Sequence, residues 1–265
     1  MLSTISKSKL TYLILFIYFL LVLWWIKIYL SGVKDGLENY YFGFFYSFIA
    51  LIGGINGLLV SRKWGGYKSL VGKGIIFLSL GLLAYWFGQA TWSFYNVFLD
   101  VEIPYPSVAD VGYFSSIIFY SLGMLAFARA SGAKMMLKKF NGKLIALSIP
   151  IIMISASYYL FLRNFSLEFS NPIKTLIEFG TPLGYAIAIS IGCLAFILSR
   201  KILGGKMKSR ILYIIFAFIA EYITDFTFLY QYADGTYYNA GINDLMFATT
   251  FTLMAIGLIS FESYE

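Results

Sequence analysis

The chain has 265 residues, of which 60% are hydrophobic, 20% aromatic and only 12% charged, and these values exclude a soluble globular domain. Its net charge of +7 is typical of lysines and arginines in cytoplasmic loops and does not require nucleic acid as a partner. A single cysteine, Cys193, and the absence of histidine exclude an internal disulfide and the usual ligands of zinc, copper and haem. We therefore expect an integral membrane protein without a metal or a cofactor.

Eight apolar segments follow one another along the chain, each long enough to cross a hydrocarbon core, which takes about 20 residues. They are Leu10–Ile28, Tyr41–Val60, Gly74–Phe94, Val111–Ala128, Leu144–Leu162, Leu176–Leu198, Ile211–Tyr230 and Leu245–Phe261. The first ends in WWIKIYL without a small-residue cleavage site, so we expect an uncleaved helix there and no signal peptide. The sequence predicts an all-α, polytopic membrane protein that forms a single integral membrane domain over residues 1–265.

Basic residues concentrate in the loops after the second, fourth and sixth segments. These loops hold Arg62, Lys63, Lys68, Lys73, Arg129, Lys134, Lys138, Lys139, Lys143, Arg200, Lys201, Lys206, Lys208 and Arg210. The loops between them hold acids and far fewer cations: Asp35, Glu38, Asp100, Glu102, Glu168 and Asp234. Because cytoplasmic loops are enriched in Lys and Arg, we expect both termini in the cytoplasm and a multi-pass protein of the cell membrane.

The two halves of the chain resemble each other, and we divide them at about 1–134 and 143–265. SRKWGG after the second segment matches SRKILGG after the sixth, and DVGYFSSIIFYSLGMLAF aligns without gaps on DLMFATTFTLMAIGLISF. The alignment superposes Asp110 on Asp244, Gly123 on Gly257 and Phe127 on Phe261, and it sets Gln89 opposite Glu221. Four helices in each unit predict a tandem 4+4 parallel repeat about an axis along the membrane normal.

The seventh segment holds two acids one helical turn apart, Glu221 and Asp225, with Thr224 beside them. Counting about 1.5 Å per residue from Arg210 places Glu221 about 16 Å deep, where a charge costs about 3 kcal/mol. Two carboxylates in a low dielectric are not expected to carry both negative charges at once. We expect a ligand, ion or proton site; the alternative is a purely structural role, with hydrogen bonds to Gln89 or to tyrosine hydroxyls.

Five further positions complete the candidate site. Gln89, Trp92 and Asn96 share one face of the third segment and could bind a ligand in an outward-opening cavity. Trp92 and Asn96 could equally lie at the outer membrane interface, where aromatic belts are normal, and this alternative is favoured. Asp110 and Asp244 each begin an inward-running helix, where a carboxylate can act as a cap. The candidate ligand- or proton-binding residues are Glu221, Asp225, Gln89, Trp92, Asn96, Asp110 and Asp244.

A short motif surrounds the outer loop after the third segment. It comprises Trp92, Pro104, Pro106, Ser107, Ala109, Asp110 and Tyr113, and an apolar helix follows. This pattern resembles the membrane-spanning N-terminal input region of bacterial and archaeal histidine kinases and diguanylate cyclases, in which a Trp precedes P-x-P-S-x-A-D-x-x-Y. The resemblance implies a sensory membrane module. Since the chain ends at FESYE without an output domain, a separate cytoplasmic signalling protein would carry the output.

We therefore expect a non-enzymatic sensory or ligand-binding module in the lipid bilayer, with a polar site between the repeats for an unidentified small molecule or ion. The alternative is a small secondary transporter coupled to protons or cations, since parallel repeats and midplane carboxylates also describe carriers. An intramembrane enzyme is the least supported class, because no nucleophile–base pair or metal cluster is present in the sequence. Paired acids could still act as acid and base.

Overall fold

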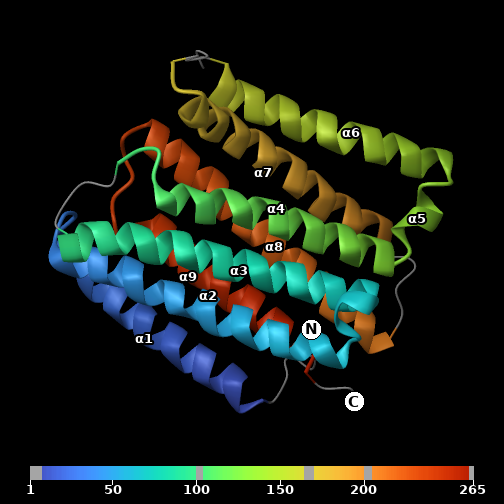
Figure 1. The fold of residues 1–265 in the computed structure, drawn as a ribbon, viewed down its shortest axis with the longest axis horizontal. Helices are drawn as coiled ribbons and strands as arrows, with labels where there is room; N and C mark the ends of the chain where they lie inside the picture. Colours follow the sequence, from blue (N-terminus) through green and yellow to red (C-terminus); the bar gives the residue numbers. More distant parts are fainter. Residues whose placement is uncertain (1–7, 100–103, 164–169, 200–204, 263–265) are drawn as a thin grey trace.

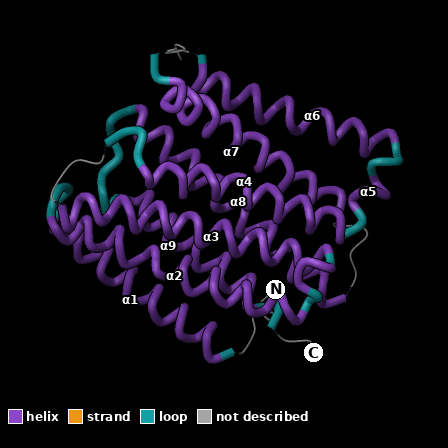
Figure 2. The backbone as a smooth tube through the Cα atoms, in the orientation of Figure 1, coloured by secondary structure: helices purple, strands orange, loops and turns teal. Residues whose placement is uncertain are grey.

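The computed structural model describes residues 8–99, 104–163, 170–199 and 205–262, and within these ranges the chain is helical and has no strand (Figures 1 and 2). The long helices are α1 (Lys9–Ser31), α2 (Leu37–Lys63), α3 (Leu70–Phe94), α4 (Val108–Ala130), α6 (Phe140–Ser157), α7 (Pro172–Ser199), α8 (Gly205–Ala233) and α9 (Ile242–Ile259). Short helices accompany them: α5 (Ala133–Met136), η2 (Gly66–Lys68), η3 (Tyr95–Leu99) and η4 (Tyr158–Leu162). Eight helices in this described part are long and apolar enough to cross a membrane.

Successive long helices run in opposite directions, so the connections alternate between the two ends of the bundle (Figure 1). We call the end that carries Ser107 and Gly235 the outer end, and the end that carries Trp64 and Ser131 the inner end. The first described helix begins at the inner end and the last one finishes there. The expected eight helices long and apolar enough to cross a membrane are therefore present, and the described ends of α2, α4 and α7 lie together at the inner end.

The predicted segments lie within the observed helices, with one exception. The last segment was expected to continue to Phe261, whereas α9 ends at Ile259. The chain turns there because other groups hold it: the indole Nε1 of Trp64 donates to the Phe261 carbonyl oxygen at 2.8 Å, and the Phe261 ring contacts the ring of Phe127. Apolar composition alone could not show this turn.

Serine side chains start several of these helices. Ser69 precedes α3, and its hydroxyl accepts the backbone N–H of Gly72 at 2.8 Å. Ser107 precedes α4 and forms a capping box with Asp110. Such caps satisfy the backbone N–H groups of the first helical turn, which have no partner within the helix. An N–H group without a partner costs more free energy in a membrane than in water.

Small residues set the helix spacing in the interior. A Cβ at Gly53 of α2 would lie 2.6 Å from the Cβ of Ala255 of α9, so these two helices approach closely only because Gly53 has no side chain. Gly57 likewise faces Leu258 of α9. The glycines of the segment GGINGLL therefore serve close helix packing, the usual role of small residues between membrane helices.

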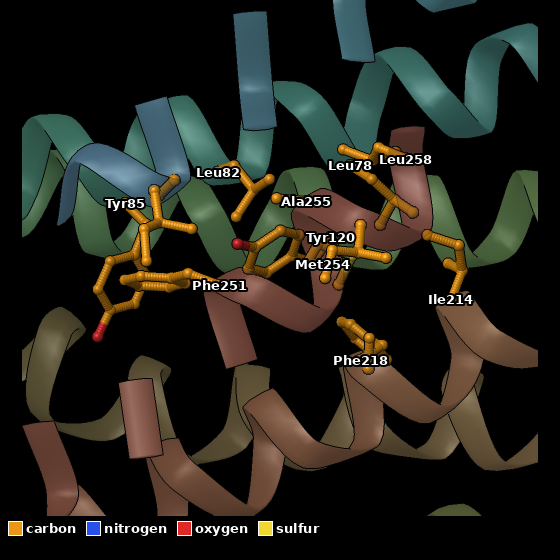
Figure 3. Close-up of a cluster of buried hydrophobic side chains, with 14 of the residues drawn as sticks. Leu78, Leu82, Tyr85, Tyr120, Ile214, Phe218, Phe251, Met254, Ala255 and Leu258 are labelled. Atoms are coloured by element: carbon orange, nitrogen blue, oxygen red, sulfur yellow. The ribbon is translucent and has the colours of Figure 1, made fainter. Parts of the chain in front are cut away.

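The centre of the bundle is apolar and aromatic. Figure 3 shows α9 between α3 and α8, with Leu78, Leu82, Phe218, Phe251, Met254, Ala255 and Leu258 packed together. Helices α1 and α6 lie at opposite edges (Figure 1), and large apolar side chains cover their outward faces. The space between the two halves of the chain is therefore filled largely by hydrocarbon side chains, and polar groups occupy only particular levels of it.

Candidate functional site

Helix α8 carries the two acids into the protein interior. Glu221 is 2% exposed and Asp225 is 4% exposed. They lie one turn apart on the face of α8 that packs against α7 and α9. A carboxylate in an apolar membrane helix must face protein or water, because lipid cannot solvate it, and here both face protein.

Few polar groups reach the pair. Tyr185 of α7 hydrogen-bonds to the Asp225 carboxyl group. Thr250 of α9 faces Glu221, but its hydroxyl donates to the Phe247 carbonyl oxygen of its own helix at 3.0 Å. Within the described chain, both oxygens of Glu221 and Oδ1 of Asp225 therefore accept no hydrogen bond. The groups there that act most strongly on the pair are Thr250, Tyr185 and the two acids themselves, and none of these is a cation.

Tyrosines of α3, α4 and α8 complete the surroundings of the pair. Tyr120 of α4 is 4% exposed, interacts electrostatically with both carboxyl groups, and has a hydroxyl without a hydrogen-bond partner in the described residues. Tyr222 of α8 stacks edge-on against Tyr185, with ring centroids 5.4 Å apart. Asp225 acts electrostatically on Tyr85 of α3, which Figure 3 shows beside Phe251. The site is thus a pair of carboxylates among aromatic rings, and Tyr185 and Thr250 are the polar side chains that act on it most strongly.

The two sides of the pair differ in polarity. Toward the inner end, α8 presents Phe218, Ile215 and Ile214, all at most 1% exposed and apolar. Toward the outer end, the Nδ2 of Asn243 donates to the Thr224 carbonyl oxygen at 3.0 Å, and the Asn243 Oδ1 has no partner in the described part of the chain. Polar groups therefore continue from the pair in the outward direction.

A second polar cluster lies at the outer end of the bundle. Asp244 accepts the backbone N–H of Ala240 at 2.7 Å and the hydroxyl of Tyr237 at 3.1 Å. Burial, and after it the charge of Asp244, raises the pKa of Tyr237 well above its usual value, so the hydroxyl stays a donor to the carboxylate. Tyr113 of α4 interacts with the same Asp244 and donates its hydroxyl to Oε1 of Gln89 at 2.8 Å. We call Gln89, Tyr113, Tyr237 and Asp244 the outer polar cluster.

The structure divides the predicted site residues into three groups. Glu221 and Asp225 form the buried pair, whereas Gln89 and Asp244 belong to the outer polar cluster. Gln89 hydrogen-bonds to Tyr113 and not to Glu221, so the direct link considered from the sequence is not formed. Asp110 belongs to none of the three groups: it closes the capping box of α4 and accepts the Ser107 N–H at 2.6 Å.

Trp92 and Asn96 make the third group. Both are partly exposed near the outer end of α3, where the Asn96 Nδ2 donates to the Trp92 carbonyl oxygen at 2.9 Å. The Trp92 ring lies 6.3 Å from that of Tyr40 on α2, measured between centroids. These contacts are the ones that an outer interface position would give, and they do not join either residue to the buried pair.

Sequence reasoning missed the tyrosines around the pair, together with Thr250 and Asn243. The chain has 22 tyrosines, so the residue type alone does not single out Tyr85, Tyr120 or Tyr185. Each lies on a helix other than α8, and only the helix packing brings them to the acids.

Comparison with known proteins gives no relative: no family model, no curated protein and no solved structure matches this chain. The resemblance of its outer loop to the input regions of histidine kinases and diguanylate cyclases therefore stays a prediction.

Proposed function

We propose that the protein is a non-enzymatic sensory or ligand-binding module of the cell membrane, and that a proton or small cation at the Glu221–Asp225 pair switches its state. One observation carries this proposal: Glu221 is 2% exposed, and neither of its oxygens accepts a hydrogen bond within the described chain. A buried charge without partners costs stability rather than adding to it. A role outside folding accounts for that cost.

A structural role, in which the acids hold neighbouring helices together by hydrogen bonds, is the competing explanation for the buried pair. It fits Asp225, which has the hydroxyl of Tyr185 as a partner on α7. It does not fit Glu221, because the hydroxyl of Thr250 donates within α9 instead. Polar residues stabilise membrane helix pairs only through the hydrogen bonds that they make. We therefore assign the switch to Glu221, and to Asp225 the role of its coupled neighbour.

A secondary transporter coupled to protons or cations is the second candidate. A carrier must expose its site to both sides of the membrane in turn. In the described structure α8 presents the apolar side chains of Phe218, Ile214 and Ile215 on the inner side of the pair, whereas the hydrogen bond between Asn243 and Thr224 lies toward its outer side. This asymmetry favours a module whose acid pair communicates with one side of the membrane. We therefore prefer the sensory function to the transporter.

The tandem repeat supports a module with two equivalent halves. Phe127 and Phe261, which the sequence alignment superposes, meet each other with ring centroids 5.7 Å apart, as residues close to a two-fold axis would. Gly123 and Gly257 are also superposed, and each is a point of close approach to the preceding helix, at Leu78 and Ile214 respectively. The pairing of α2 with α9 corresponds to that of α7 with α4 when the halves are exchanged.

Orientation and partner follow from the loop charges and from the resemblance. We propose that both termini lie in the cytoplasm, because the helix ends that flank the three basic segments of the sequence lie at the inner end of the bundle. A cytoplasmic signalling protein would then read the state of the inner end.

The test compares Glu221→Gln with wild type in proteoliposomes, using protons as the probe. Intrinsic tryptophan fluorescence is followed between about pH 5 and pH 9, the range in which buried carboxyl groups titrate. We expect a pH-dependent change in wild type that Glu221→Gln removes while its melting temperature stays the same. The matched control is Glu178→Gln, which removes a partly exposed carboxylate of α7 that pairs with Lys174.

Two results separate the candidates. A pH response that Glu221→Gln leaves intact contradicts the proposed switch. Movement of protons across the proteoliposome membrane, followed with an enclosed pH-sensitive dye under a sodium gradient and lost in Glu221→Gln, would instead establish the transporter.

A further inference from the structure

We propose that the segment 129–143, which connects α4 to α6 at the inner end of the bundle, is a binding surface for the headgroups of anionic phospholipids. We call it the interfacial segment, and its cations are Arg129, Lys134, Lys138, Lys139 and Lys143. The proposal does not depend on the Glu221–Asp225 pair. It can therefore fail while the proposed function holds, and it can hold while the proposed function fails.

The interfacial segment lies at the level where the chain enters the membrane. Helix α4 ends at Ala130, and the next membrane span, Phe140–Leu162, begins shortly after it. This span has 23 residues, or about 34 Å of helix, which is slightly more than the thickness of a hydrocarbon core. Figure 1 shows α5 at the edge of the bundle, at its inner end. The first turn of α6 and the residues before it therefore lie at the boundary between hydrocarbon and headgroups.

The segment has one side toward the protein and one side toward its surroundings. Helix α5 packs on α4 and α7, and its first residue, Ala133, is buried. In contrast, Met135 and Phe140 are 65% and 75% exposed, and Leu137 is exposed as well. The Met135 N–H donates to the Gly132 carbonyl oxygen at 2.9 Å, so the backbone is held in a turn. The exposed apolar side chains are thus fixed at the membrane boundary, where lipid can cover them.

Cations surround these apolar side chains, and no acid of the segment balances them. The sequence has no Asp or Glu between Asp110 and Glu168. Four of the five cations have described side chains, and all four are exposed: Arg129, Lys138, Lys139 and Lys143. Within the described residues, none of the four forms an ion pair or lies over an aromatic ring. Their charges therefore face the surroundings without compensation by the protein.

Exposed cations beside exposed apolar side chains match a lipid with a negatively charged headgroup. Met135 and Phe140 can enter the edge of the hydrocarbon while the lysine ammonium groups stay at the level of the phosphates, because a lysine side chain is long and flexible. A cluster of about four to eight lysines and arginines next to a membrane helix is typical of binding to acidic lipids. We therefore expect the segment to prefer phosphatidylglycerol, which carries a net negative charge, to phosphatidylcholine, which carries none.

The basic loop between α2 and α3 provides a comparison of similar charge. Its exposed cations are Arg62, Lys63 and Lys68. Its exposed aromatic side chain, Tyr67, already contacts a cation of the protein, since the Nζ of Lys73 lies 4.7 Å from the ring centroid. The two groups that would engage a lipid are partly engaged with each other, so this loop should contribute less to a preference for anionic lipid.

Lipid quenching in proteoliposomes tests the inference on the full chain. A fluorophore is attached to Asn141→Cys in a Cys193→Ala background, because Asn141 is exposed within the segment. Nitroxide-labelled phosphatidylglycerol or phosphatidylcholine is titrated into phosphatidylcholine vesicles, and contact with the nitroxide quenches the fluorophore. Each lysine near a membrane surface favours anionic lipid by about fivefold, so half-maximal quenching by phosphatidylglycerol should require a mole fraction at least about tenfold lower.

Two triple variants locate the preference. Combining Lys138→Gln, Lys139→Gln and Lys143→Gln should bring the two titrations to within about twofold of each other. The matched control combines Arg62→Gln, Lys63→Gln and Lys68→Gln, which removes the same charge from the other loop and should retain most of the preference. All six side chains are exposed, so both variants should fold with an unchanged melting temperature.

Two further measurements examine charge and apolar contact separately. In the wild type, raising the ionic strength from about 0.05 M to about 0.5 M should weaken the preference, because salt shortens the range of electrostatic attraction. Phe140→Gln keeps every cation, so the preference should persist while quenching by both lipids weakens.

Three results would overturn the inference. The first is equal quenching by the two lipids in the wild type. The second is an equal loss of preference in the two triple variants, because the attraction would then belong to the net charge of the inner end and not to the interfacial segment. The third is unchanged quenching in Phe140→Gln, which would show that the apolar side chains do not contact lipid. None of these results bears on the switch at Glu221, which the pH titration tests separately.

Discussion

At the scale of single residues, Glu221 and Asp225 differ although they are neighbours on one helix face. Asp225 has the hydroxyl of Tyr185, whereas Glu221 has no hydrogen-bond partner within the described residues. In a folded protein an unsatisfied buried polar group is a destabilising feature, and apolar replacements of similar volume are often neutral or stabilising. The two acids should therefore respond differently to the same kind of substitution.

The variant Glu221→Met should raise the stability of the folded protein, by about 1–4 kcal/mol, because it removes the desolvation cost of an unpartnered carboxyl group and keeps its volume. Thermal unfolding in detergent measures this, with Asp225→Leu as the comparison that loses a hydrogen bond and should be destabilised. A lower melting temperature for Glu221→Met would indicate that Glu221 holds helices together, contrary to the switch proposal.

At the scale of elements, a buried carboxylate holds the start of α9. Asp244 is 1% exposed and accepts both the Ala240 N–H and the Tyr237 hydroxyl. Ala240 has a φ of 59°, an unusual conformation for a residue with a Cβ. The carboxylate thus fixes the loop that precedes α9 and sets the level at which this helix enters the core.

Removing this carboxylate should destabilise the fold. In Asp244→Ala the buried N–H of Ala240 loses its acceptor, which should cost about 1–3 kcal/mol, and Asp244→Asn should cost less because an acceptor remains. Chemical or thermal unfolding of the two variants measures the difference. Asp110→Ala serves as the control, since Asp110 is only partly buried and its loss should be milder. An equal loss in the free energy of unfolding for Asp244→Ala and Asp110→Ala would contradict the difference in burial between these two carboxylates.

The elements were predictable from sequence to different degrees. Apolar length identified every long helix, because a membrane span leaves a signal in composition alone. Glu221 and Asp225 could be found from composition too, because charged residues stand out within an apolar segment. Tyr85, Tyr120 and Tyr185 could not be found, because tyrosine is common in this chain and helical phase does not say which neighbouring helix a face will meet.

The equivalence of Gln89 and Glu221 shows a second limit of sequence reasoning. Positions that correspond in a repeat contact each other only near the axis that relates the halves. Phe127 and Phe261, which the alignment superposes, contact each other with ring centroids 5.7 Å apart, whereas Gln89 pairs with Tyr113 and Glu221 remains separate. A polar site shared by equivalent residues could therefore not be inferred from the alignment.

At the scale of the whole molecule, the bundle has one polar approach and one apolar side. The outer polar cluster, the Asn243–Thr224 contact and the acid pair follow one another along the inward direction, and apolar side chains of α8 and α9 continue from there. Protein interiors pack densely and do not deform continuously, so a charge change at the pair would shift helices as units. Helix α8 and the two helices that pack on it at the pair, α7 and α9, are the elements expected to move.

The orientation of this assembly can be measured directly. Cysteines introduced at Ser107 and Gly235 should react with an impermeant reagent added to intact cells, and one at Gly205 should react only after lysis, because the basic loops are expected in the cytoplasm. The native Cys193 is replaced by alanine in all three variants to avoid a background signal. Labelling of Gly205 in intact cells would reverse the orientation and with it the cytoplasmic placement of both termini.

The central claim is that the Glu221–Asp225 pair exchanges a proton in the folded protein, and equilibrium infrared difference spectroscopy across pH tests it most directly. Two carboxyl groups this close in a low-dielectric interior should not carry both charges together, so one protonated carboxyl stretch should be present and should change with pH. The account predicts that Glu221→Gln removes or shifts this band, whereas the partly exposed control Glu178→Gln leaves it in place. A spectrum in which no protonated carboxyl band responds to Glu221→Gln at any pH would contradict the account.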